Sequence, residues 1–153
     1  MYMDAELSFN AVTTTANVLA HTAQAETTVA DHTSTNVIDV THIPRTVLAD
    51  LYLVVQIVVV PVSAGGGTLQ ISLRASAAEA LTASTTLWDS GLLANATIVA
   101  YTANSIIYSV KLPPAIPLRY IGMNYAIATA ELTAGSWVAF LTPDAPYYIA
   151  ATV

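Results

Sequence analysis

Residues 51–60 read LYLVVQIVVV and contain no glycine, proline or charged residue. Most of these side chains are β-branched or otherwise bulky and apolar, which predicts a β-strand. A half-buried strand alternates apolar and polar positions, whereas here both the odd-numbered and the even-numbered positions are largely apolar. Both faces of this strand must therefore be covered, one by a second sheet of the same domain and the other by a loop or a neighbouring chain.

Alternation of apolar and polar positions predicts further strands. The clearest covers residues 68–76, in which the apolar residues from Leu69 to Ala75 point inward. A second long strand is predicted at residues 118–129, where Gly122 marks a bulge or a close approach of two backbones. The remaining strands are predicted at residues 4–9, 37–40, 97–101, 105–112 and 135–141, with a short extended piece at 87–91.

The intervening segments are predicted to be turns and loops. The central strand is expected to end at Pro61, and SAGGG at residues 63–67 predicts a hairpin to the next strand. Residues 41–50 are interpreted as a loop and residues 77–83 as one helical turn. Residues 10–33 have no firm period, and we interpret them as a short strand or an irregular arm.

About eight strands, with turns at roughly ten-residue spacing and no convincing helix, predict an all-β protein. The first interpretation is an antiparallel β-sandwich, a jelly roll of about eight strands, and the second is a different Greek key. The chain of 153 residues suits a single domain covering residues 1–153. Residues 147–153 form a tail that could pair with a sheet edge or a partner.

Composition narrows the class of partner. Charged residues make up only 9% of the chain and apolar types 55%, which is typical of a protein that packs against other subunits. The net charge is −6, and the four basic residues are scattered, so nucleic-acid binding is not expected. The N-terminus lacks a signal-peptide pattern. The longest apolar run, at residues 51–62, is shorter than the roughly 20 residues of a membrane helix, so no membrane partner is expected.

The chemistry-bearing residues predict no catalytic, cofactor or metal site. The chain has no cysteine, and His21, His32 and His42 match no short metal-ligand spacing, so they are interpreted as solvated loop residues. Asp39 is interpreted as an outward or turn-capping carboxylate. No nucleophile elbow, glycine-rich phosphate loop or zinc-protease motif is present, and we expect no enzyme activity.

Several stretches, taken in order, resemble the capsid cement proteins of short-tailed bacteriophages, the family typified by the cement protein of a Bordetella phage. They are MYMDAEL at 1–7, STNVID at 34–39, LYLVV at 51–55, LQISL at 69–73, KLPP at 111–114 and LRYIGMNY at 118–125. The resemblance covers nearly the whole chain. The sequence departs from the family pattern in the Thr/Ala-rich residues 10–33 and in residues 41–50, which carry Pro44 and Arg45 in place of a glycine-rich turn.

The resemblance implies a jelly-roll protein without a catalytic centre that forms a homotrimer in the virion. Such trimers sit on the outer surface of the capsid at three-fold and quasi-three-fold positions, where they clamp neighbouring subunits of the phage major capsid protein. The net negative charge agrees with that role, and so does the strand at residues 51–60, which is apolar on both faces. Two other classes stay open, a carbohydrate-binding β-sandwich that uses Trp88 and Trp137 as a platform, and a jelly-roll coat protein that forms the shell itself.

For the interface we hypothesise two groups of residues. Tyr52, Val54 and Val58 lie on the face of the central strand that meets the partner. Arg119 and Tyr120 make polar anchoring contacts. Arg119 can equally be a solvent-facing charge at the start of a strand.

Overall fold

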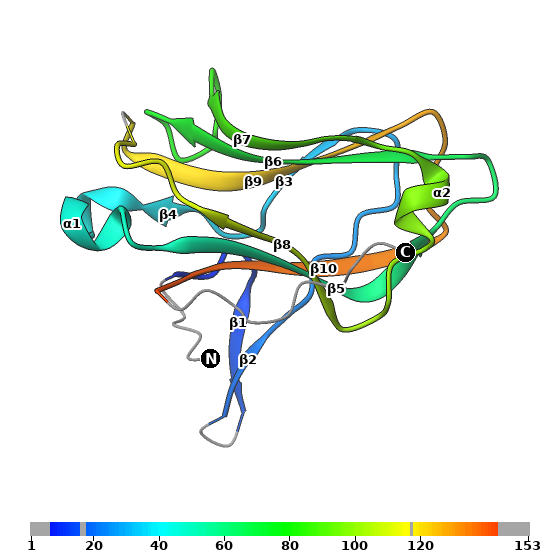
Figure 1. The fold of residues 1–153 in the computed structure, drawn as a ribbon, viewed down its shortest axis with the longest axis horizontal. Helices are drawn as coiled ribbons and strands as arrows, with labels where there is room; N and C mark the ends of the chain where they lie inside the picture. The colour runs from blue at the N-terminus through cyan, green and yellow to red at the C-terminus, as the bar shows by residue number, and fades with distance from the viewer. Residues whose placement is uncertain (1–6, 16–17, 117, 144–153) are drawn as a thin grey trace.

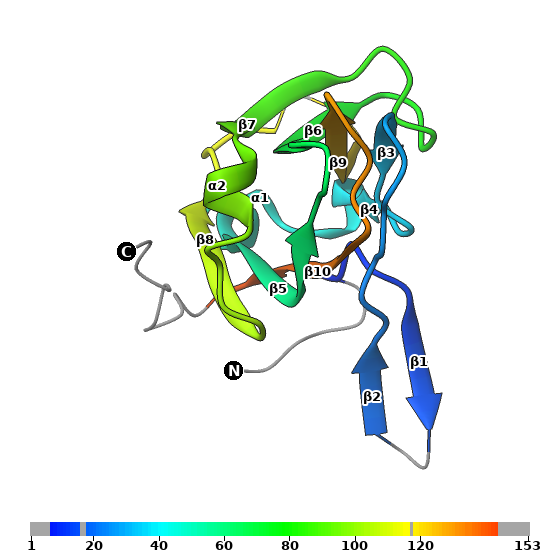
Figure 2. The ribbon, with the colours of Figure 1, turned by 90° about the vertical axis from the view of Figure 1, so that its right-hand side faces the viewer.

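The computed structural model describes residues 7–15, 18–116 and 118–143, and it shows two antiparallel sheets packed face to face (Figures 1 and 2). One sheet has three strands in the order β10–β5–β8. The other has five, in the order β3–β9–β6–β7 with β4 also paired to β9. The eight strands of the sandwich are β3 (Asp31–Thr33), β4 (Ile38–Asp39), β5 (Tyr52–Val62), β6 (Thr68–Ser76), β7 (Thr85–Leu93), β8 (Ser105–Lys111), β9 (Tyr120–Ala128) and β10 (Ala134–Thr142).

This strand order is that of a jelly roll. From β4 onward, the chain changes sheet at every connection except the one between β6 and β7. Ser8 and Gln24 add isolated bridges to Phe140 and Trp137 on the outer edge of β10, so the three-stranded sheet gains a short fourth partner there. The predicted all-β antiparallel sandwich is therefore confirmed, and two stacked Greek keys account for its order.

The main core lies between the two sheets. The strand β5 is central in its sheet, as predicted, and Leu53, Val55 and Ile57 point into the core. The predicted inward residues of β6 and the buried apolar residues of β9 meet them from the opposite sheet. Trp137 of β10 packs against Tyr125 of β9 with 5.0 Å between ring centroids. Burial of each large apolar side chain contributes about 1.5–3 kcal/mol, which makes this interior the main source of stability.

The predicted hairpin between β5 and β6 is wrong. The two strands belong to different sheets, so residues 63–67 carry the chain across the sandwich instead of folding it back on its neighbour. A glycine-rich turn reverses the direction of the chain, but it does not determine whether the two strands that it connects pair with each other. The strand also continues past Pro61, which lies where the ladder to β10 shifts register, so its missing N–H removes no regular sheet bond.

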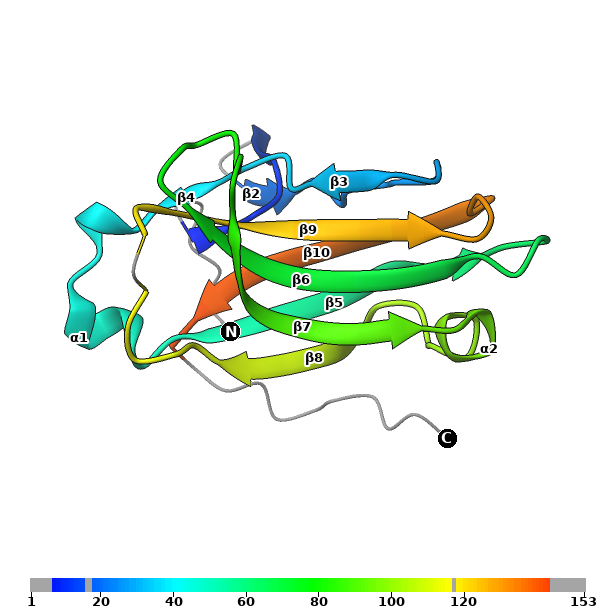
Figure 3. The same ribbon diagram turned by 90° about the horizontal axis from the view of Figure 1, so that it is seen from above.

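Three local predictions are corrected at the ends of the sandwich. The loop at 41–50 contains a 3₁₀ turn, η2 (Val40–His42), and one α-helical turn, α1 (Arg45–Leu48). The strand predicted at 97–101 is instead a helical turn, α2 (Asn95–Ile98), which places Ile98 in the core. Residues 77–83 form bends and turns rather than a helix. Figure 3 shows α1 and α2 at opposite ends of the strands.

Residues 10–33 contain a separate hairpin. The strands β1 (Val12–Thr15) and β2 (Val18–His21) pair only with each other among the described strands, and they project from the sandwich (Figures 1 and 2). Of the strand predicted at 4–9, only residues 7–9 are described, and they form an isolated bridge from the buried Ser8 to Phe140 rather than a regular strand. The predicted tail at 147–153 lies outside the described residues.

Two further sequence expectations can be compared with the structure. The extended piece at 87–91 is part of the longer strand β7. The bulge or close backbone approach expected at Gly122 is wrong, because β9 pairs with β6 there without a register shift. The close neighbour is a side chain instead, since a Cβ atom at residue 122 would lie 2.5 Å from Leu81 Cδ1. Within the described part of the chain, no helix is long and apolar enough to span a membrane.

Candidate interaction surface

A second apolar cluster lies on the face of the three-stranded sheet that points away from the main core. At its centre are the buried side chains of Val54, Val138 and Phe140, and Val54 is 0% exposed. Ala23, Val58 and Ile106 pack around them and remain partly exposed. We call these six residues the outer cluster. It explains why β5 carries apolar residues on both faces.

The outer cluster continues into exposed apolar side chains at one end of β5. Val59 is 48% exposed and Val62 is 45% exposed, on a strand that has no charged residue. Most exposed residues of a soluble protein are polar, although single exposed valines are common. Here several partly or fully exposed apolar residues follow one another along β5, with Ile106 on its neighbour β8, and this arrangement favours a surface for contact with another protein.

The structure separates the five predicted interface residues into two places. Val54 and Val58 meet in the outer cluster, and Tyr52 is half-buried at the beginning of the same strand. Arg119 and Tyr120 lie at the start of β9, in the opposite sheet. The two groups therefore do not form one continuous patch on a single sheet.

Sequence reasoning missed the outer-cluster residues outside β5, namely Ala23, Ile106, Val138 and Phe140. A signal was present for two of them. The run WVAFL at residues 137–141 is apolar at every position, as in β5, and a strand apolar on both faces indicates a covered outer face. No comparable run marks Ala23.

Arg119 is bound within the chain. Its Nε and Nη2 atoms donate to Asp39 Oδ2 at 2.9 and 2.7 Å, and its Cζ atom lies 4.9 Å from the centre of the Tyr120 ring. The other oxygen of Asp39 accepts the backbone N–H and the hydroxyl of Thr41 at 3.0 and 2.7 Å. Asp39 is thus a turn-capping residue, as predicted, and it also joins β4 to β9 by an ion pair.

These contacts change the ionisation of both partners. The hydrogen bond from Arg119, followed by those from Thr41, holds the pKa of the Asp39 carboxyl well below its usual range. The same ion pair raises the pKa of the Arg119 guanidinium. Both groups carry full charge at neutral pH, but each already has a partner. This geometry favours a structural role over a free anchoring group.

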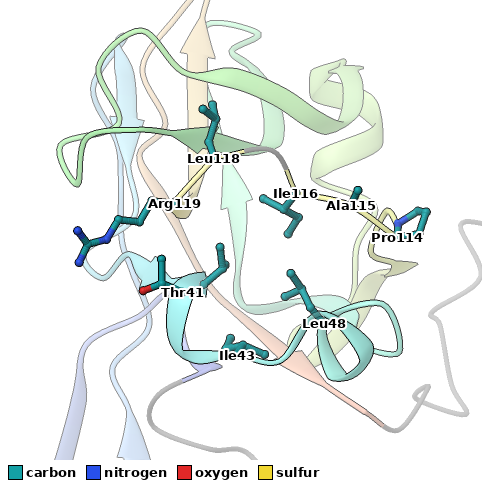
Figure 4. A pocket seen from close by; sticks show the side chains of 9 residues that line it. Thr41, Ile43, Leu48, Pro114, Ala115, Ile116, Leu118 and Arg119 are labelled. Carbon is teal, nitrogen blue, oxygen red and sulfur yellow. The ribbon is translucent and has the colours of Figure 1, made fainter.

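Beside this ion pair is a cavity of ≈ 370 Å³ at the α1 end of the sandwich. Aliphatic side chains from the η2–α1 segment and from the connection between β8 and β9 line it, and Figure 4 shows the Arg119 guanidinium pointing away from it. Thr41 is the other polar residue among the described residues that line the cavity. Among the described residues that line it, the cavity therefore has no pair of groups for acid–base or nucleophilic chemistry.

The interpretation of all three histidines as solvated loop residues is wrong for His21 and His32, which belong to the strands β2 and β3. His32 lies between Glu26, with 3.0 Å from Nδ1 to Oε2, and the Thr28 carbonyl, 2.9 Å from Nε2. His42 is 84% exposed, and His21 belongs to β2. Among the described residues, no group of three or more His, Cys, Asp or Glu side chains could hold a metal ion. Trp137 is completely buried in the core, so it cannot serve as an exposed platform for a carbohydrate, and Trp88 packs edge-on against Tyr108 with 5.0 Å between ring centroids.

Comparison with known families gives the context for this surface. The sequence profile of the Bbp16 family matches residues 20–141, which is most of the chain and includes every strand of the sandwich apart from part of β10. The chain belongs to the Bbp16 family. The family name is consistent with a protein family of Bordetella phages, in agreement with the resemblance seen in the sequence. No curated protein matches the chain.

Proposed function

We propose that this Bbp16-family chain is a capsid cement protein of a phage. Three copies associate on the outer surface of the head, and each trimer clamps neighbouring subunits of the major capsid protein. Membership of a phage protein family supports this role in general terms. The observation that carries the proposal is the outer cluster, with its partly exposed residues Val58 and Ile106 and the neighbouring exposed valines of β5.

The physical argument starts from what a cement protein needs. It must present apolar surface to another subunit without being insoluble by itself, and it needs no chemical centre. A jelly roll with a partly covered outer cluster meets both requirements. Trimerisation then links three modest contacts, and this linkage raises the apparent affinity for the shell by about 10² to 10⁴.

Charge is compatible with an exterior position. The net charge of −6 repels packaged nucleic acid, and the basic groups of Lys111 and Arg119 are paired with Asp50 and Asp39. Contact between neighbouring copies at the outer cluster would depend on apolar burial. Such contact should be only weakly sensitive to salt.

The proposal is tested by adding the purified chain to phage shells that lack it. The expected result is saturable binding to the particles and an increase in the temperature at which they break open. A control variant, Leu92→Asp, changes an exposed residue of β7 in the opposite sheet and should bind as the natural chain does. Failure of the natural chain to bind shells at any concentration would contradict the proposal.

A further inference from the structure

The hairpin of β1 and β2 is paired with no other strand in the described part of the chain. Its strands pair from Val12↔His21 to Thr15↔Val18. We call these two strands the arm. Figures 1 and 2 show the arm projecting on the side of the three-stranded sheet, away from the five-stranded sheet.

The foot of the arm is fixed to β10. Asn10 Nδ2 donates to the Trp137 carbonyl at 3.1 Å, and the Ala139 amide donates to Asn10 Oδ1 at 2.7 Å. On the returning strand, Gln24 exchanges two backbone hydrogen bonds with Trp137, at 2.8 and 3.0 Å. Because both ends of the arm are bound to the same buried strand, the sandwich sets the direction in which the arm points.

The outer edges of the arm carry backbone groups that pair with no described strand. The Thr22 amide donates to the Ala11 carbonyl at 2.8 Å just below the hairpin, and hydrogen-bonded pairs alternate with non-bonded pairs along an antiparallel ladder. The pair Thr14↔Leu19 is therefore a non-bonded pair, whose N–H and C=O groups point outward. A two-stranded hairpin alone is marginally stable in water, so these edges favour a partner strand.

The sequence of the arm leaves those edges open. Residues 12–21, VTTTANVLAH, contain no Asp, Glu, Lys or Arg. Edge strands of natural sheets are commonly protected from unwanted pairing by charged residues, proline or bulges. The described strands of the arm have no proline and no register shift.

We propose that the arm docks on a second copy of this chain. Ala23, two residues after β2, packs on the outer cluster, so the arm borders the surface at which the proposed function places a neighbouring copy. A copy resting on that surface lies beside the arm and can pair with its outward backbone groups. Neither the arm nor the outer cluster has an Asp, Glu, Lys or Arg residue, so the net charge of −6 does not oppose contact there.

This inference rests on the proposed trimer, and two variants test it. In the first, residues 12–21 are replaced by Gly-Gly, which can join Ala11 to Thr22 because these residues are already hydrogen-bonded. The second, Thr14→Pro, removes one outward N–H and keeps the inner ladder. Thr14→Val is the matched control, because it retains the backbone amide.

The readout is the mass in solution by light scattering over a range of concentrations, with circular dichroism to show that each variant is folded. We expect a trimer for the natural chain and for Thr14→Val, monomers for the trimmed chain, and a trimer weakened about tenfold or more for Thr14→Pro. If the chain with residues 12–21 replaced fails to fold, the mass of Thr14→Pro in solution tests the inference by itself. If the natural chain is a trimer and both variants form trimers of the same stability, the arm does not dock on a second copy and this inference is overturned, while the proposed trimer stands. The same conclusion holds if the variants still form trimers but no longer bind the shell. A monomeric natural chain would overturn the proposed trimer as well.

Discussion

Arg119 Nη2 lies 2.7 Å from Asp39 Oδ2 and joins two residues that are 80 positions apart in the sequence. The contact connects the start of β9 to β4, whose two residues pair with Ile121 and Tyr120. It therefore fixes the short edge strand from which the chain leaves for the η2–α1 segment. Neither residue needs to touch a partner for this role.

The ion pair predicts a pH-dependent contribution to stability. The pKa of Asp39 in the folded chain lies below its ordinary value of 3.8, so the contribution is fully present well above that pH and is lost as the pH falls through the folded value. Urea unfolding should therefore show Asp39→Asn less stable than the natural chain at pH 7, with a gap that narrows below about pH 4. Asp50→Asn, which removes the exposed pair of Asp50 with Lys111 at 3.5 Å, is the control and should have a smaller effect. A gap of the same size at pH 7 and pH 2 contradicts this role.

Gly122 and Leu81 predict a steric coupling. A Cβ atom at residue 122 would lie 2.5 Å from Leu81 Cδ1, and Leu81 is itself buried, so Gly122→Ala should destabilise the fold by about 1–3 kcal/mol. Leu81→Ala removes the clashing atom. The double variant should therefore lose less stability than the sum of the single changes, by about 1 kcal/mol, in denaturant titrations. Additive effects would show that the crowding is elsewhere.

The hydroxyl of Tyr125 predicts an unusual response to substitution. The side chain is fully buried, burial raises its pKa, and its oxygen has no hydrogen-bond partner among the described residues. Tyr125→Phe should be neutral or should stabilise the protein by up to about 1 kcal/mol, because it removes an unpaired polar group. A clear loss of stability in Tyr125→Phe would reveal a bound water at the hydroxyl.

The outer cluster predicts a change in assembly without a change in fold. Val58 is half-buried at the margin of the cluster, so Val58→Asp should keep the sandwich intact and convert trimers to monomers in light scattering. Val54 is a poorer probe, because an aspartate at a completely buried position would unfold the chain. Leu92→Asp should leave the mass unchanged. Trimers of normal stability in Val58→Asp would remove the outer cluster from the interface.

The strands most fully buried were the ones that sequence could predict. β6, β9 and β10 were placed to within one or two residues at most termini because their apolar residues alternate or run without interruption. The apolar pattern did not predict which strands pair with one another. The turn after β5 looks like a hairpin turn, and only the packing of β6 between β7 and β9 shows that the chain crosses to the other sheet.

Short elements such as α2 could not be predicted from the sequence, because tertiary contacts override the local preference of residues for helix or strand. Thr97, Ile98 and Val99 are β-branched and suggest a strand, yet burial of Ile98 beneath the end of the sandwich is compatible with a single helical turn. The same limit applies to the candidate surface. The apolar faces of β5 placed Val54 and Val58 together, whereas nothing local could show that Arg119 would be bound to Asp39.

The measurement that tests the central claim most directly is a cryo-electron microscopy reconstruction of the phage particle that carries this chain. The account predicts a jelly-roll trimer at three-fold and quasi-three-fold positions outside a separate protein shell, with the outer cluster and the arm in contact with neighbouring copies. A reconstruction in which this chain builds the shell itself, or is absent from the head, would contradict it.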